Sequence, residues 1–210
     1  MTTATSDVMT AEAQSATTPS GAIDRLAAGN ARFVEAAAAE RDLLAQVAAT
    51  ASGQHPFVAI VSCIDSRVPP EFVFDLGIGD AFVARTAGNV VDGDVLGSLE
   101  FATAVAGAKA VVVLGHSACG AVKGACDGVE LGHLTGLLAK ISPSVEAVAG
   151  EPTPGSGDAD LVQKVVEQHV DAMASDIVGR SDVIAGLVES GDLVVAGAVY
   201  DLETGVVTWQ

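Results

Sequence analysis

Two short segments of the chain combine residue types that bind metals or orient water. The first, CIDSR at residues 63–67, holds a cysteine, an aspartate and an arginine. The second, HSACG at residues 116–120, holds a histidine and a second cysteine. Thiolates and imidazoles are ligands that zinc prefers, and a carboxylate paired with an arginine can orient a neighbouring group. The two segments therefore predict metal-assisted chemistry, provided that the fold brings them together.

Each segment directly follows a continuous apolar run, FVAIV at residues 57–61 and AVVVL at residues 110–114. Such runs are typical of strands that are buried on both faces. In an open parallel sheet, residues beyond the carboxyl ends of neighbouring strands line the ligand crevice. We therefore expect Cys63 and His116 to meet if the two strands are neighbours. Cys119 would turn back to the same centre from the first turn of a helix.

Two thiolates and one imidazole form a catalytic zinc set that leaves the fourth tetrahedral position free. Asp65 is near enough in sequence to reach that position, or it can pair with Arg67 on the same side of an extended chain. An aspartate with these two partners would switch the site between open and closed to water. Three other interpretations remain open: ordinary buried cysteines, a redox pair without Cys-x-x-Cys spacing, or a structural zinc site with Asp65 as permanent ligand.

Buried strands alternate with helical segments along the chain, which predicts an α/β fold. We expect a mainly parallel central β-sheet of about five strands, flanked by helices, with an N-terminal helical arm. Residues 1–20 lack periodicity and predict a flexible arm, and residues 21–210 predict a single domain. Two finer expectations are an Ala-rich helical region over residues 22–51 with a break at Gly29, and a surface loop over residues 142–158.

The composition excludes several classes of partner. Ten Lys and Arg stand against 27 Asp and Glu among 210 residues, which gives a formal charge of −17. Nucleic acids and anionic membrane surfaces attract clustered cations, so neither is expected as a partner. Three cysteines are too few for a disulfide scaffold and favour a reducing compartment. Without an apparent secretory signal or membrane-spanning stretch, the chain is expected to be cytoplasmic.

Taken together, the two segments resemble the signature pair of the β-class carbonic anhydrases. The resemblance extends over most of the chain outside the arm. Four further blocks are similar to family blocks: GNARF at 29–33, RTAGN at 85–89, SLEFA at 98–102 and YDLETG at 200–205.

The resemblance implies reversible hydration of carbon dioxide to bicarbonate and a proton, by attack of a zinc-bound hydroxide. It implies one Zn²⁺ per chain on Cys63, His116 and Cys119, with an Asp65–Arg67 dyad beside it. It also implies a homodimer or an assembly of dimers.

Substrate-pocket positions of the family correspond to Gln54, Phe82, Ala87 and Phe101. Ala87 is smaller than the valine common in the family, and Phe101 lacks the hydroxyl of a frequent tyrosine. Packing in the core is an equally good explanation for the two phenylalanines.

One branch of the family closes its site when bicarbonate binds elsewhere, using a tryptophan three residues before the first cysteine. Ile60 occupies that position here, which favours the open-site, plant-like branch. Arg85 and Tyr200 do fit positions that the closing branch also uses, so a pH switch stays open. In a closed state Asp65 would become the fourth zinc ligand.

Two alternative functions fit the same residues. A carbonyl sulfide or carbon disulfide hydrolase would use the same metal chemistry on a sulfur analogue of the substrate. A non-catalytic zinc or bicarbonate-sensing protein would keep Asp65 on the metal.

Overall fold

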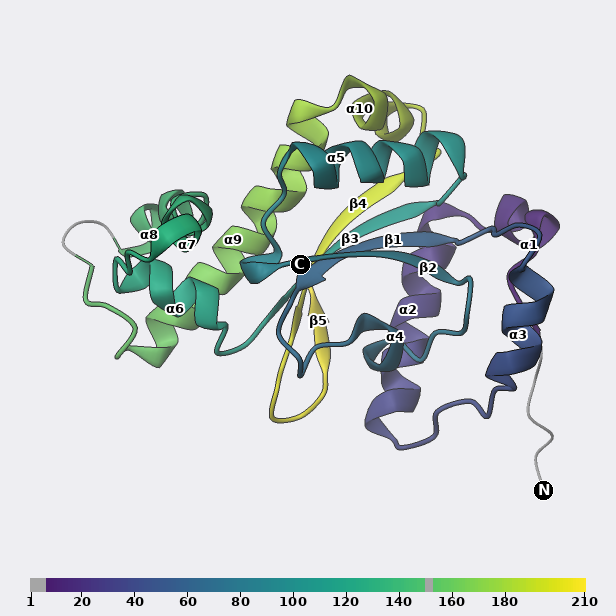
Figure 1. The fold of residues 1–210 in the computed structure, drawn as a ribbon, viewed down its shortest axis with the longest axis horizontal. Helices are drawn as coiled ribbons and strands as arrows, with labels where there is room; N and C mark the ends of the chain where they lie inside the picture. The colour runs from purple at the N-terminus through teal and green to yellow at the C-terminus, as the bar shows by residue number, and fades with distance from the viewer. Residues whose placement is uncertain (1–6, 150–152) are drawn as a thin grey trace.

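A five-stranded β-sheet with the strand order β2-β1-β3-β4-β5 forms the centre of the computed structural model (Figure 1). The structure describes residues 7–149 and 153–210. The first four strands are parallel, and β5 runs antiparallel to β4. This confirms the predicted α/β class. The strands are β1 Val58–Cys63, β2 Ala81–Thr86, β3 Ala110–His116, β4 Val194–Tyr200 and β5 Val207–Trp209.

Helices cover both faces of this sheet and extend beyond its ends (Figure 1). One face packs against α5 (Gly93–Glu100), its π-helical continuation η2 (Phe101–Val105), α9 (Ala159–Arg180) and α10 (Asp182–Glu189). The other face packs against α2 (Pro19–Val34) and α4 (Pro70–Val73). The remaining elements are α1 Ala11–Ala16, α3 Leu43–Thr50, η1 Ala87–Asn89, α6 Gly120–Cys126, α7 Gly132–Leu138 and α8 Ser142–Ala149.

Strands β1 and β3 are adjacent at the centre of the sheet, and the chain leaves them toward opposite faces. The connection from β1 to β2 passes through α4, whereas the connection from β3 to β4 passes through α9 and α10. The carboxyl ends of β1 and β3 therefore form a topological switch point, where open α/β sheets bind their ligands. The two strands are neighbours, which is the condition under which Cys63 and His116 were expected to meet.

Helix α2 continues through Gly29, so the predicted break at this residue is wrong. Gly29 is buried where α2 crosses the end of α4, and a Cβ at this position would clash with the carbonyl oxygen of Phe74. Because glycine has no side chain, it allows the two backbones to pack closely, although it lowers the intrinsic stability of the helix.

The segment predicted as a loop over residues 142–158 contains α8, so that prediction is wrong for residues 142–149. Pro143 lies in the first helical turn, where its missing N–H costs no hydrogen bond. Val145 is buried in the core cluster that includes α9. Tertiary contact with α9 thus stabilises a short helix whose Pro and Ser content resembles that of a loop.

The N-terminal segment differs in part from the arm expected over residues 1–20. Residues 1–6 lie outside the described residues. Helix α1 and the start of α2 fall within the expected arm, and Met9 is buried in the core. The amide of Gln14 donates hydrogen bonds to the carbonyl oxygens of Pro56 and Ala106, at 2.7 and 2.8 Å. These contacts tie residues 9–16 to the loops at the amino ends of β1 and β3.

Within the described ranges, every helix is too short or too polar to cross a membrane.

Candidate metal centre

The side chains of Cys63, His116 and Cys119 converge at the carboxyl ends of β1 and β3. One ligand atom from each residue lies within 4.8 Å of the ligand atoms of the other two. Cys63 is the last residue of β1, His116 is the last residue of β3, and Cys119 directly precedes α6. All three side chains are buried. The structure thus brings together the three residues that the sequence predicted.

The imidazole of His116 is oriented by the backbone. Its Nδ1 lies 2.9 Å from the carbonyl oxygen of Ser117, which can only accept, so Nδ1 carries the proton and donates. Its Nε2 is therefore the ring atom that is available to bind a metal. This atom is fully buried and has no hydrogen-bond partner among the described residues. A buried acceptor without a partner, facing two sulfurs, fits a metal ligand.

The two thiols are so close that each changes the acidity of the other. Hydrogen bonding from the Cys119 thiol, together with the adjacent His116 and backbone N–H groups, lowers the pKa of Cys63 to about 4. The same contact, together with burial, raises the pKa of Cys119. One thiolate forms readily, whereas a second needs a nearby cation. Two sulfurs and one imidazole nitrogen are a donor set that suits zinc. A bound zinc ion would be the cation that allows the second thiolate to form.

Asp65 lies beside this cluster and is held by Arg67. Asp65 Oδ2 accepts a hydrogen bond from Arg67 Nη2 at 2.8 Å, and Oδ1 accepts from Arg67 Nε and from the Arg67 backbone N–H. These bonds keep the pKa of Asp65 well below its usual range. Asp65 Oδ2 lies 3.9 Å from His116 Nε2. The carboxylate is therefore ionised and adjacent to the ligand atoms, with Arg67 as its bonded partner.

The backbone around the cluster adds contacts that the sequence analysis did not assign. The N–H of Gly88 donates a hydrogen bond to Cys63 Sγ at 3.3 Å. Arg85 donates to the carbonyl oxygens of Cys63 and Asp65, at 2.9 and 2.5 Å, and so fixes the chain between these two residues. A backbone amide leaves no signal in residue type. The sequence analysis identified Arg85 as the first residue of the RTAGN block, but it did not predict that Arg85 holds the loop.

Of the four predicted substrate-pocket residues, the structure brings one next to the cluster. Ala87 directly follows β2, whose last residue, Thr86, pairs with Cys63. Phe82 pairs with Ala59, four residues before Cys63, which places it about 13 Å from the cluster along the strand.

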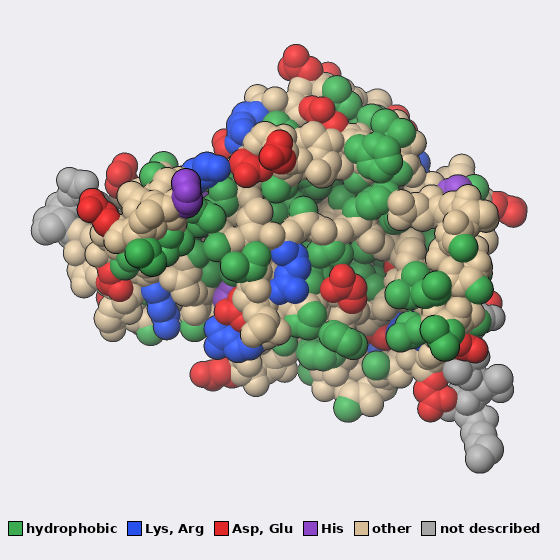
Figure 2. Space-filling model, in the orientation of Figure 1, with side chains coloured by type: hydrophobic (Ala, Val, Ile, Leu, Met, Phe, Trp, Pro, Cys, Tyr) green, Lys and Arg blue, Asp and Glu red, His purple; other side chains and the backbone are tan. Residues whose placement is uncertain are grey.

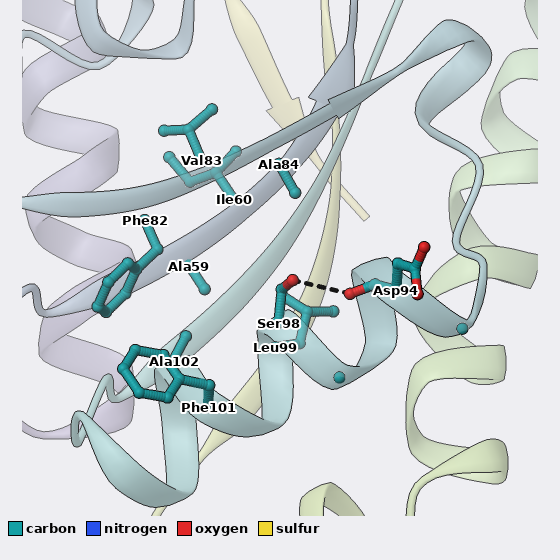
Figure 3. A pocket seen from close by; sticks show the side chains of 12 residues that line it. Ala59, Ile60, Phe82, Val83, Ala84, Asp94, Ser98, Leu99, Phe101 and Ala102 are labelled. Carbon is teal, nitrogen blue, oxygen red and sulfur yellow. Dashed lines mark hydrogen bonds between the residues drawn. The ribbon is translucent and has the colours of Figure 1, made fainter.

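Phe82 and Phe101 instead meet each other at an apolar cavity of about 750 Å³ between β2 and α5 (Figure 3). Their ring centroids are 6.1 Å apart, with the rings edge to face. Phe101 is half exposed. Hydrophobic side chains also gather on the surface between α5 and α4, where the edge strand β2 runs (Figure 2). This face of the molecule is more apolar than the strongly acidic composition suggests.

Gln54 is exposed on the loop that precedes β1 and lines a shallow pocket with residues of 50–53 and 78–79. It lies at the amino end of the strand, whereas Cys63 lies at the carboxyl end. Within one chain, Gln54, Phe82 and Phe101 are thus separated from the metal cluster. Their role in binding substrate stays a prediction.

Comparison with known proteins gives consistent relatives over nearly the whole chain. The family model described as carbonic anhydrase matches residues 58–207. Carbonic anhydrase 2 of Mycobacterium tuberculosis is 38% identical over 191 residues, which cover 90% of this chain and 91% of that protein. A carbonic anhydrase of Mycolicibacterium smegmatis is 34% identical over 193 residues, covering 89% of this chain and 91% of the relative.

Solved structures have the same fold. A tetrameric β-carbonic anhydrase of Sordaria macrospora superposes with a TM-score of 0.71 at 28% identity, covering 77% of this chain and 84% of that one. A Coccomyxa β-carbonic anhydrase in complex with acetazolamide gives a TM-score of 0.71 at 26% identity, covering 89% and 80%.

Replacing Cys119 by serine should remove one of three ligands. We expect Cys119→Ser to bind zinc at least about tenfold more weakly than wild type, because a hydroxyl is a poor substitute for a thiolate. Zinc per chain, measured by atomic emission after dialysis against a weak chelator, checks this. Cys126→Ser is the matched control, since Cys126 is also buried but stands outside the cluster. Equal zinc retention in both variants would contradict the ligand role of Cys119.

Proposed function

This chain belongs to the β-class carbonic anhydrase family and is a carbonic anhydrase, and we propose that it hydrates carbon dioxide at one zinc ion held by Cys63, His116 and Cys119. The products are bicarbonate and a proton, and the reaction is reversible. The observation that carries the proposal is the convergence of two buried sulfurs and an unpartnered imidazole nitrogen beside an ionised aspartate.

When bound, zinc acts as a Lewis acid and lowers the pKa of a water molecule, so that the water can lose a proton and attack carbon dioxide near neutral pH. The side chains around the ion have to balance its positive charge without making the site strongly negative. Two thiolates cancel the charge of a divalent ion, and an ionised Asp65 nearby makes the site net negative. Arg67 offsets this excess and, through its bonds to both carboxylate oxygens, keeps Asp65 off the ligand position.

Asp65 then orients the attacking water. Oδ1 accepts two hydrogen bonds from Arg67, whereas Oδ2 accepts one and keeps a lone pair on the side that faces His116. A carboxylate oxygen in this position accepts a hydrogen bond from water and points the lone pair of the water toward the carbon atom. Asp65 would orient the water without taking up its proton, because Arg67 holds the pKa of this carboxylate well below its usual range.

We propose that the chain belongs to the open-site, plant-like branch. Two features support this. Asp65 is bonded to Arg67 at three points, and the position three residues before Cys63 is the buried Ile60, which offers no indole N–H to a second bicarbonate.

The substrate side of the site, in this proposal, is completed by a second copy of the chain. Gln54, Phe82 and Phe101 are too far from the cluster of their own chain to touch a substrate on its zinc. Phe101 is half exposed, and hydrophobic side chains gather on the surface between α5 and α4 (Figure 2), which favours burial against another subunit. A homodimer, or an assembly of dimers, would place the phenylalanines of one subunit over the zinc of the other.

The central experiment is stopped-flow carbon dioxide hydration with zinc content measured on the same samples. We expect activity in proportion to zinc. Turnover of carbonyl sulfide is measured in parallel, and a higher rate on this gas would assign the site to the hydrolase alternative. Zinc-loaded protein without hydration of either gas would favour the non-catalytic alternative.

Asp65→Asn should keep zinc and lose hydration activity. The amide no longer holds Arg67 by charge and offers one oxygen instead of two, so we expect a decrease in kcat of about 10- to 100-fold. Asp24→Asn, on the exposed face of α2, is the control and should match wild type. Wild-type kcat in Asp65→Asn would remove Asp65 from the mechanism.

The pH profile should distinguish the two branches. Because Arg67 keeps the pKa of Asp65 well below its usual range, Asp65 remains ionised above pH 5 and contributes no step near neutrality. We expect activity to rise with pH through a single ionisation, with or without added bicarbonate. A steep, cooperative loss below about pH 8 that deepens with bicarbonate would place the chain in the closing branch.

Mixing two variants with impaired activity tests whether the pocket is shared between subunits. Asp65→Asn lacks the orienting carboxylate, and Phe101→Ala lacks a pocket side chain. If Phe101 acts on the partner's zinc, each mixed dimer contains one wild-type site, so equal mixing should restore about a quarter of wild-type activity per chain. If Phe101 acts within its own chain, mixed dimers contain no wild-type site and the mixture stays as inactive as its components.

A further inference from the structure

Helix α9 holds the segment that follows β2 through three side chains. His169 Nε2 lies 3.0 Å from the carbonyl oxygen of Gly88. Met173 Sδ accepts a hydrogen bond from the N–H of Val91 at 3.5 Å, and Arg180 Nη1 donates to the Val91 carbonyl oxygen at 3.1 Å. These contacts join residues that are more than 80 positions apart in the chain. The path of the segment is therefore set by α9.

The hydrogen bonds of His169 fix its tautomer. A carbonyl oxygen only accepts, so Nε2 carries the proton that is donated to Gly88. Nδ1 then accepts from the hydroxyl of Ser144, at 3.2 Å, on α8. The ring is 1% exposed, and this burial lowers the pKa of His169, so the imidazole stays neutral. A neutral ring with one donor and one acceptor satisfies both neighbours completely.

Gly88 joins this histidine to the metal cluster. Its carbonyl oxygen accepts from His169, while its own N–H donates to Cys63 Sγ at 3.3 Å. Gly88 has φ 65°, and a Cβ would lie 2.7 Å from Ile141 Cδ1, so any other residue would be strained here. Asn89 is also left-handed, with φ 46°. A left-handed Asn89 is unfavourable for the free chain, and the contact that holds Gly88 itself in place is the hydrogen bond from His169.

We propose that His169, with Ser144 behind it, is a positioning residue of the metal centre: it holds Gly88 so that its amide N–H points at the sulfur of Cys63. The inference rests on the proposed metal site. An N–H donor on a thiolate draws electron density from the sulfur, so the sulfur gives less charge to a bound metal. Without the donor, the sulfur is more electron-rich, which shifts its charge-transfer band, but it is also less precisely placed, and this loss of geometry lowers the metal affinity.

Two substitutions separate the contacts of His169. In His169→Gln, the amide Nε2 stands at the same number of bonds from Cα as the imidazole Nε2, so the donor to Gly88 is kept. In His169→Asn, the shorter amide reaches only the position of Nδ1, so the bond to Gly88 is lost. Ser144→Ala removes the donor that fixes the tautomer. Met173→Leu is the control, because it disturbs Val91 on the same segment without touching Gly88.

The measurements are cobalt(II) affinity by chelator competition and the sulfur-to-cobalt charge-transfer absorption in the near ultraviolet, with thermal unfolding for each variant. We expect His169→Asn to bind cobalt about tenfold more weakly, with a shifted charge-transfer band. His169→Gln should restore most of both properties. Ser144→Ala should show a smaller change in the same direction, and it serves as the test if His169→Asn does not fold. Met173→Leu should keep the wild-type spectrum whatever its melting temperature.

Wild-type affinity and spectrum in both His169→Asn and Ser144→Ala would overturn the inference and leave His169 a purely structural residue. An equal loss in Gln and Asn variants would also overturn it, since the donor to Gly88 would then be irrelevant. Failure of the wild-type chain to bind cobalt through sulfur would instead contradict the proposed metal site. The two failures are therefore distinguishable.

Discussion

The central physical constraint is the repulsion between two thiolates that share one buried space. Cys63 and Cys119 cannot both ionise beside each other in a low-dielectric site unless a cation neutralises them. The parallel sheet brings them together because β1 and β3 end side by side. His116, with its unpartnered Nε2 beside the two sulfurs, completes a set that suits a divalent metal such as zinc. The other residues of the site keep the net charge around this set of ligands close to zero.

Asp65 shows how that balance is kept. A third negative group so close to two thiolates would bind the metal and exclude water if nothing restrained it. Arg67 bonds both carboxylate oxygens and lies two residues away, so a short loop supplies both the acid and its restraint. Arg85 anchors the same loop by two backbone carbonyls, which limits how far Asp65 can move. In the proposed mechanism, access of water to the metal therefore depends on the rigidity of this loop as much as on its charges.

The sequence was sufficient for the parts of the structure that depend on local pattern. Two continuous apolar runs predicted central strands, and the residue types after each run predicted the metal cluster. The sequence was insufficient where contacts between residues distant in the chain determine the local backbone conformation. Gly29 was predicted as a helix break because glycine lowers helix propensity, yet here it permits close contact with Phe74. Residues 142–149 were predicted as loop because of Pro143, although burial against α9 makes them helical.

The same limit applies to the site. The ligands were predictable because their chemistry is carried by side chains at strand ends. The donor from Gly88 was not, because a backbone amide has no signature, and His169 gave no signal because its partners lie 81 and 25 residues away. Phe82 and Phe101 were assigned by family likeness to a substrate pocket, yet within one chain they face a separate cavity. A sequence motif specifies which residues act together but not whether they come from one subunit. That distinction lies in the assembly, and here the distance along β2 is what makes a second subunit necessary for the proposed pocket.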